Sequence, residues 1–213
     1  TAAIILMVSL GIGLQRVNNQ SMQAIGELTE IRVFSPSRFQ GMGVSAGSSD
    51  LRLDAKTVRS FDEIPGVAGV TPQIYLNGGA ELNYKRLTGY GNVLGIKPQA
   101  LHAMNFDMKS GMARLGQWQA IAGSRIAQNL MDARTGRPVE EPVDLQGQVL
   151  VLTLNRITEE GAPVQRQVRV RIAGVLNQMG NENDNALLLS LKDVGELNSW
   201  FAGRKVNYDR DGY

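Results

Sequence analysis

The 213-residue chain contains no cysteine and only one histidine, His102. The lack of cysteine excludes disulfides, iron–sulfur clusters, thiol catalysis and cysteine-based zinc sites. A single histidine excludes a multi-histidine metal site and leaves little for acid–base chemistry. Acidic and basic residues nearly balance, at 20 and 22, so the concentrated basic stripe of a nucleic-acid-binding protein is missing. We expect no cofactor, no metal and no nucleic acid partner.

A long hydrophobic run is also missing, but a short one opens the chain. Residues 1–14 are apolar and uncharged, and as a helix they would span about 20 Å, less than the ~30 Å core of a bilayer. A signal peptide would have a basic start, which this segment lacks. A buried core helix and the outer end of a truncated membrane helix stay open. We favour the membrane helix, because the run continues without a helix breaker into a polar, still helical stretch.

A helical stripe follows in that polar stretch. Apolar or small residues recur at steps of four and three at Leu10, Leu14, Val17, Ser21, Ala24, Leu28 and Ile31. This pattern is typical of a stalk that packs along one partner, although an ordinary amphipathic surface helix would also show it. Leu10, Leu14, Val17 and Leu28 are the candidate stalk or dimer contacts. The other end, Tyr213, follows a turn-like segment, so both ends are expected to be cuts in a longer protein.

Between the ends, the first part of the chain has the pattern strand, helix, strand. Residues 30–34 form a β-like run, and a Gly- and Ser-rich loop follows over 35–50. Asp54 is the expected N-cap of a helix through Ile64 that ends at Pro65-Gly66. A strand is expected within residues 67–78.

The remainder of the chain is richer in β-strand patterns. We expect a strand over 92–96, a helix over 119–131, and a hairpin of strands over 148–155 and 164–177. The helix is inferred from Ile126 and Leu130, which are spaced i and i+4. In the second hairpin strand, arginines alternate with apolar residues, which indicates one buried and one exposed face. A strand over 186–191 and a helix over 192–200 complete the pattern.

One motif suggests chemistry. Residues 43–47 match the G-x-S-x-G pattern of serine hydrolases, with Ser45 as nucleophile and His102 as the available base. The motif lies in a Gly- and Ser-rich loop and lacks the strand-to-helix turn that such a nucleophile needs. We therefore favour a flexible loop, and a surface or boundary position for His102.

Other features have simpler explanations. The glycine pairs at 41–43 and 89–91 open no helix that would hold a phosphate. The residues Asn207, Asp209 and Asp211 imitate a calcium loop but lack its later glutamate. The acidic segment 181–185 is expected to be a solvated loop. The aromatic residues Trp118, Trp200 and Phe201 are expected to pack locally rather than to anchor a partner.

Several segments in this order resemble the extracytoplasmic core domain of MacB/FtsX-type ABC transporter permeases. They are residues 7–16, 61–72, 95–98, 122–127, 147–151, 170–176 and 192–197. The resemblance implies an α+β, bilobed domain. Its parts would be 1–27, the end of a transmembrane helix and stalk; 28–80, half of a membrane-proximal βαβ lobe; 81–180, an inserted β-rich lobe; and 181–213, an incomplete return to the first lobe.

The resemblance also implies a function. Such permeases do no covalent chemistry outside the membrane and couple cytoplasmic ATP hydrolysis to export, lipoprotein handling or signalling by mechanical movement. The implied partners are a cytoplasmic ABC ATPase, a second permease copy, the membrane and a periplasmic adaptor, with this domain on the outer side of the cell membrane. The parent gene would encode three more membrane helices after Tyr213. A serine hydrolase using Ser45 and a free-standing anchored binding module are the alternatives.

Overall fold

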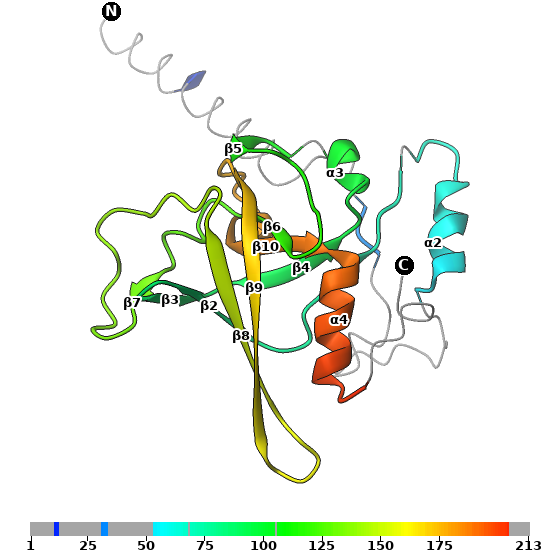
Figure 1. Ribbon diagram of the computed structural model, residues 1–213. Helices are drawn as coiled ribbons and strands as arrows, with labels where there is room; N and C mark the ends of the chain where they lie inside the picture. Colours follow the sequence, from blue (N-terminus) through cyan, green and yellow to red (C-terminus); the bar gives the residue numbers. More distant parts are fainter. Residues whose placement is uncertain (1–10, 13–30, 34–52, 68, 105, 205–213) are drawn as a thin grey trace, which may run out of the picture.

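The computed structural model describes residues 11–12, 31–33, 53–67, 69–104 and 106–204. In this part of the chain, ten strands form one mixed sheet in the order β1-β4-β10-β6-β9-β8-β2-β3-β7, with β5 paired to β9 (Figure 1). The strands are β1 (Gln73–Tyr75), β2 (Ala80–Tyr84), β3 (Leu87–Tyr90), β4 (Asn92–Ile96), β5 (Met108–Gly111), β6 (Gln119–Ala122), β7 (Met131–Asp132), β8 (Val149–Ile157), β9 (Pro163–Leu176) and β10 (Ala186–Ser190). The helices are α2 (Ala55–Asp62), α3 (Ala100–Ala103) and α4 (Leu191–Phe201), with a 3-10 turn, η2 (Glu182–Asn185).

The middle of the sheet is buried on both faces. Every residue of β10 is buried, and β10 runs parallel to β4 and antiparallel to β6. Leu187 and Leu189 point into a core that also contains Val194 and Leu197 of α4. Leu188 points to the opposite face, into a smaller core. A strand covered on both sides has no need for polar alternation, which explains the continuous apolar run of β10.

The hairpin of β8 and β9 confirms the sequence prediction. Val168, Val170 and Ile172 are buried, while Arg169 and Arg171 are exposed. β9 pairs with β8 along its first nine residues, with β6 in parallel from Arg171 onward, and with β5 near its end. Figure 1 shows the hairpin extending past the other labelled elements. One strand therefore belongs both to the hairpin and to the covered middle of the sheet.

The helix expected after Asp54 is also confirmed. The Asp54 carboxylate accepts a hydrogen bond from the backbone N–H of Thr57 at 2.8 Å and caps α2. This bond lowers the pKa of the Asp54 carboxyl, because it favours the charged form. The helix ends at Asp62, just before Pro65, and Gly66 has a positive φ of 92°. Ile64 lies beyond the last turn and is exposed.

The helix predicted over 119–131 is wrong. Residues 119–122 form β6, and turns follow as far as residue 129. Ile126 and Leu130 are both fully buried, so their spacing reflects a turn that fills the core rather than a helix. A side chain at Gly123 would collide with the carbonyl oxygens of Asn183 and Asp184. That close approach requires glycine, and it is the point where the chain leaves the strand.

Two smaller predictions need correction, and one is confirmed. Residues 31–33, the described part of the strand expected over 30–34, are not in a strand. The strand expected within 67–78 is present as the three-residue β1. The segment 181–185 is not a solvated loop: Asn183 and Asp184 are buried, because η2 packs against the sheet.

One sheet contains the described strands of all three expected parts, 28–80, 81–180 and 181–213. β4, from the middle part, pairs with β1 from the first and with β10 from the last. The mixture of helix and strand expected from the sequence is present. No helix in the described ranges is long and apolar enough to cross a membrane.

Candidate functional site at the α4 junction

The predicted contact residues Leu10, Leu14, Val17 and Leu28 lie outside the residues that the structure describes. The same is true of Ser45, of the glycines at 41–43 and of the calcium-like segment from Asn207 to Asp211. His102 falls within α3, and its side chain is not described. The second glycine pair lies at the end of β3, away from any helix start.

The site that the described residues do form surrounds helix α4. Ser190 caps this helix: its hydroxyl oxygen accepts a hydrogen bond from the backbone N–H of Asp193 at 3.1 Å. Leu191, Val194 and Leu197 are buried and attach the helix to the sheet. At 100° per residue, Asp193, Glu196 and Trp200 share one side of the helix, and Asn198 lies on another. We call Asp193, Glu196, Asn198 and Trp200, with their partners, the α4 junction.

The first contact of the junction runs from α4 to β9 through Trp118. The Asp193 carboxylate accepts a hydrogen bond from the backbone N–H of Trp118 at 3.1 Å, and the Trp118 carbonyl accepts one from the N–H of Arg171 at 2.9 Å. Trp118 has a φ of 50°, a conformation that is uncommon for a large side chain. Both backbone groups of this strained residue are therefore held from outside.

Asp193 is itself in an unusual state. The residue is 3% exposed. Burial raises the pKa of the Asp193 carboxyl above its usual value, against the opposing hydrogen bonds of Ser190 and Trp118. A buried carboxylate costs stability when it carries its charge. The hydrogen bond from Trp118 indicates that Asp193 serves to position that loop.

Two further contacts join α4 to the β8–β9 hairpin. The Glu196 carboxylate pairs with the Arg166 guanidinium of β9 at 2.5 Å, and both side chains are partly shielded from water. One helical turn later, the Arg156 guanidinium of β8 lies over the Trp200 ring, 5.0 Å from its centre. Trp200 meets Phe201 edge to face, with ring centres 5.2 Å apart. Trp118, Trp200 and Phe201 all pack against the main core, as the sequence predicted.

The opposite side of α4 is tied to β1. The Asn198 amide donates to the Tyr75 carbonyl at 2.9 Å, and its oxygen accepts from the Asn77 N–H at 2.8 Å. Val194 packs so closely on Gly95 of β4 that a Cβ there would lie 2.9 Å from it. Polar contacts on two sides thus fix both the position and the rotation of the helix.

A second buried carboxylate fixes the start of β10. Asp184 is 1% exposed and accepts hydrogen bonds from the Ser124 hydroxyl at 2.9 Å and from the N–H groups of Met179 and Gly180 at 2.9 and 2.8 Å. It therefore joins the loop after β6 to the loop that leaves β9. This contact sets where the chain enters β10 and then α4.

The polar groups of the junction contact other parts of the domain. Its carboxylates are occupied by backbone N–H groups or by arginine, so none is aimed at an open site. Within the described ranges, no three His, Cys, Asp or Glu residues lie close enough together to hold a metal ion. What the contacts accomplish is to hold β1, the Trp118 loop and the hairpin in one fixed arrangement around α4.

Comparison with known proteins identifies the class of domain. The family model for the MacB-like periplasmic core domain matches residues 1–208, and this defines an extracytoplasmic domain of an ABC transporter permease. The chain belongs to the MacB-like periplasmic core domain family. The resemblance stated from the sequence is therefore confirmed. No curated protein sequence matches the chain significantly.

Three solved structures are similar to parts of the chain. The extracellular domain of the noncanonic ABC-type transporter YknZ from Gram-positive bacteria has 11% identity and a TM-score of 0.41, with 71% of this chain and 84% of that chain covered. The periplasmic region of MacB from Actinobacillus actinomycetemcomitans has 16% identity and a TM-score of 0.39, with 67% and 57% covered. A domain of a putative permease protein from Porphyromonas gingivalis has 17% identity and a TM-score of 0.39, with 72% and 57% covered. The chain thus spans little more than half of the last two.

The polar residues of the junction were not singled out from the sequence. The i, i+3 spacing of Asp193 and Glu196 marks them as neighbours on a helix, but surface salt-bridging residues show the same spacing. Their partners, Trp118 and Arg166, lie 75 and 30 residues away, and no local pattern points to them.

Proposed function

We propose that this domain is the rigid extracytoplasmic head of an ABC permease and that it transmits movement without catalysing a reaction itself. During its ATP cycle, a cytoplasmic ATPase would draw two permease copies together, and the stalks would move the heads. The work done outside the membrane would be export, lipoprotein handling or signalling. Membership of the MacB-like family supports the transporter context.

The observation that carries the mechanical part is the α4 junction. A head can pass on a displacement only if its parts do not slide past each other. Asp193, Glu196 and Asn198 reach three different segments, and β9 belongs both to the hairpin and to the middle of the sheet. A movement applied to one part of this sheet would therefore be shared by the hairpin and by α4.

The remaining parts of the proposal concern the rest of the protein. We propose that residues 1–27 form the membrane helix end and stalk, and that Leu10, Leu14, Val17 and Leu28 contact a stalk or the second permease. Residues 28–80 and 181–213 would belong to a membrane-proximal lobe and 81–180 to an inserted lobe. The partners would be the ATPase, a second permease, the cell membrane and a periplasmic adaptor.

The test is a distance between two heads in the intact transporter. These 213 residues contain no cysteine, so Gln167→Cys, at an exposed position of β9, introduces a single labelling site within the domain. Any cysteine elsewhere in the parent permease and its ATPase is first replaced by serine. The parent permease, assembled with its ATPase in lipid nanodiscs, would carry this spin label and a matching one on the neighbouring permease. We expect the distance between the labels to differ between the nucleotide-free state and the ATP-trapped state.

An ATPase variant that binds but cannot hydrolyse ATP supplies the trapped state, and one that cannot bind ATP is the control. The control should keep the nucleotide-free distance when ATP is added. If the distance between the heads is the same in all states, the head does not move with the ATP cycle and the proposal is wrong.

A further inference from the structure

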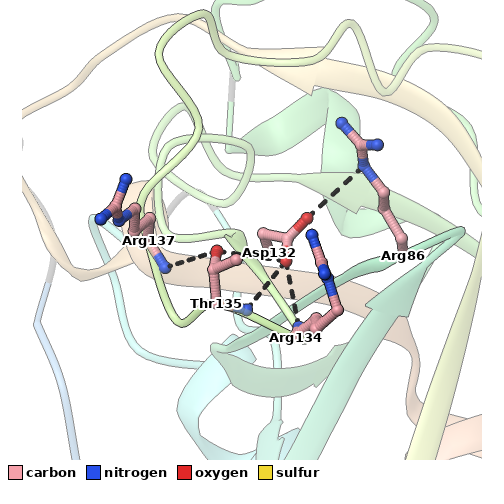
Figure 2. A network of polar contacts seen from close by, with 5 residues as sticks. All are labelled: Arg86, Asp132, Arg134, Thr135 and Arg137. Carbon is pink, nitrogen blue, oxygen red and sulfur yellow. Dashed lines mark hydrogen bonds and ion pairs between the residues drawn. The ribbon is translucent and has the colours of Figure 1, made fainter.

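A cluster of basic side chains lies at the edge of the sheet that is farthest along the strand order from β1. Lys85 and Arg86 form the turn between β2 and β3, and Arg134 and Arg137 lie in the turn after β7, which pairs with β3. All four residues are exposed. We call these four residues the β3–β7 basic cluster, and Figure 2 shows its three arginines around Asp132.

The turn that carries Arg134 and Arg137 is held in one shape by Asp132. One carboxylate oxygen accepts hydrogen bonds from the N–H groups of Arg134 at 3.0 Å and Thr135 at 2.9 Å, and from the Thr135 hydroxyl at 3.2 Å. The other oxygen lies 3.6 Å from Nε of Arg86. The Asp132 N–H also donates to the Arg137 carbonyl at 2.9 Å. The arginines are therefore presented on a preorganised turn, with the Arg86 side chain 86% exposed beside them.

The β2–β3 turn is unusual in its residues. Tyr84 pairs with Leu87, so Lys85 and Arg86 alone connect the strands, and Lys85 has a φ of 53°. Glycine and asparagine are the residues that such tight hairpin turns favour. Two cations occupy the turn instead, and Lys85 is partly supported by the Tyr84 ring, 4.9 Å from its ammonium group. The turn therefore places two adjacent cations where an uncharged residue is usual.

Positive charge predominates at these two turns. The cluster has four positive charges around the one carboxylate of Asp132. Because the Asp132 carboxylate is already used by the turn, the four cations keep most of their capacity for an outside anion. Glu140 and Glu141 follow on the same loop and are exposed.

We propose that the β3–β7 basic cluster is a docking surface for an acidic segment of a partner protein. Three of its four cations are arginines, whose planar guanidinium groups bind carboxylates in a paired geometry. The two turns of the cluster contain none of the large exposed apolar residues of the described ranges: Tyr90 lies at the other end of β3, and Met112 and Ile157 lie on other segments. An apolar face that would enter a bilayer is thus missing from the cluster, which favours a protein partner over a lipid surface. This inference does not depend on the proposed transmission of movement.

The test measures binding of a fluorescent oligoglutamate peptide to the whole chain by anisotropy. We expect saturable binding that weakens as the ionic strength rises from about 0.05 M to about 0.5 M, because exposed charges are screened. Arg134→Glu with Arg137→Glu should weaken it about ten-fold or more, since like charges then face the peptide. The control, Arg169→Glu with Arg171→Glu on the exposed face of β9, changes the net charge equally and should change affinity less than about two-fold.

Circular dichroism on both double variants establishes that each is folded. Three results would overturn the proposal. They are no binding of the peptide by the unaltered chain, an equal loss in the β9 control, and stronger binding to vesicles of phosphatidylglycerol than to the peptide. The last result would assign the cluster to lipid headgroups.

Discussion

The α4 junction and the β3–β7 basic cluster are both organised by an aspartate that accepts hydrogen bonds from backbone N–H groups. Asp193 is buried and reaches Trp118, 75 residues away in the sequence. Asp132 is half-buried, and its bonds to Arg134 and Thr135 span two and three residues. Burial raises the pKa of the Asp193 carboxyl, whereas the hydrogen bond from the Thr135 N–H lowers that of Asp132.

The difference shows how one residue type does two kinds of structural work. In the junction, the carboxylate joins elements that are distant in sequence, and its desolvation is offset by the packing around it. In the turn, the carboxylate shapes a few neighbouring residues and stays near water. The first arrangement makes a region rigid over a long range, and the second presents side chains outward. Mutations should therefore cost global stability at the junction and binding at the cluster.

The largest effect is expected from the apolar contact beneath the junction. Leu197 is fully buried, so Leu197→Ala should lower the free energy of unfolding by about 2–5 kcal/mol. Urea unfolding followed by circular dichroism measures this change. The exposed Val149 on β8 is the control, and Val149→Ala should cost less than about 0.5 kcal/mol. Equal losses would show that α4 is not packed into the core as described.

A smaller loss is expected for the polar contact to β1. Asn198→Ala removes both hydrogen bonds to β1 and its loop, and should cost about 1–3 kcal/mol, since the Asn77 N–H and Tyr75 carbonyl lose their partner. Asn155, which accepts a hydrogen bond from Gln165 on the exposed face of the hairpin, is the matched control. Asn155→Ala should change urea stability by less than about 0.5 kcal/mol. If Asn198→Ala leaves the free energy of unfolding unchanged, these two hydrogen bonds do not hold α4 against β1.

The two ion pairs, Arg166–Glu196 and Arg86–Asp132, should differ in coupling energy, by less than the variants above differ from their controls in stability. A double-mutant cycle on Arg166 and Glu196, with glutamine at each position, should give a coupling of about 1 kcal/mol, because both side chains are partly shielded. The same cycle on Arg86 and Asp132, whose closest charged atoms are 3.6 Å apart with Arg86 exposed, should give no measurable coupling. A larger coupling at the turn than at the junction would reverse the comparison.

The smallest effect is a difference in pH dependence. The folded pKa of Asp193 lies above the ordinary value of 3.8. At pH values between 3.8 and the folded pKa, the folded state therefore binds more protons than the unfolded state. That contribution to the free energy of unfolding falls as the pH rises through the window. Asp193→Asn should abolish it.

Asp132 should behave in the opposite sense. Its folded pKa lies below 3.8, so its stabilising contribution is present above that value and is lost as the pH falls through the folded pKa. Asp132→Asn should abolish this acid-side loss. Thermal unfolding at a series of pH values measures both variants. Difference curves that slope in the same direction would contradict the two assignments.

The sequence predicted the elements whose pattern is local. The alternation in β9, the apolar run of β10 and the Asp54 cap each follow from neighbouring residues, and all three are present. The spacing of Ile126 and Leu130 led to the wrong prediction of a helix over 119–131. A turn buries an apolar pair four residues apart as well as a helix does. Asp184 was expected in water, since nothing in an acidic segment indicates that Ser124 and two backbone N–H groups will enclose it.

The candidate site was harder to predict than the fold. The polar contacts of the α4 junction join α4 to segments that are distant in sequence and that only the folded sheet brings near it, as for Arg166 and Tyr75. The sequence did predict the family, because several short segments occur in the expected order.

The most direct test of the account is the distance between α4 and the hairpin during the ATP cycle. Spin labels at Lys192→Cys and Gln165→Cys, both exposed positions, would report this distance in the parent permease with its ATPase. If the head is rigid, this distance distribution is the same in the nucleotide-free and ATP-trapped states, while the distance between two heads changes. A shift of the α4–hairpin distance between these states would show that the head deforms, and would contradict its role as one rigid body.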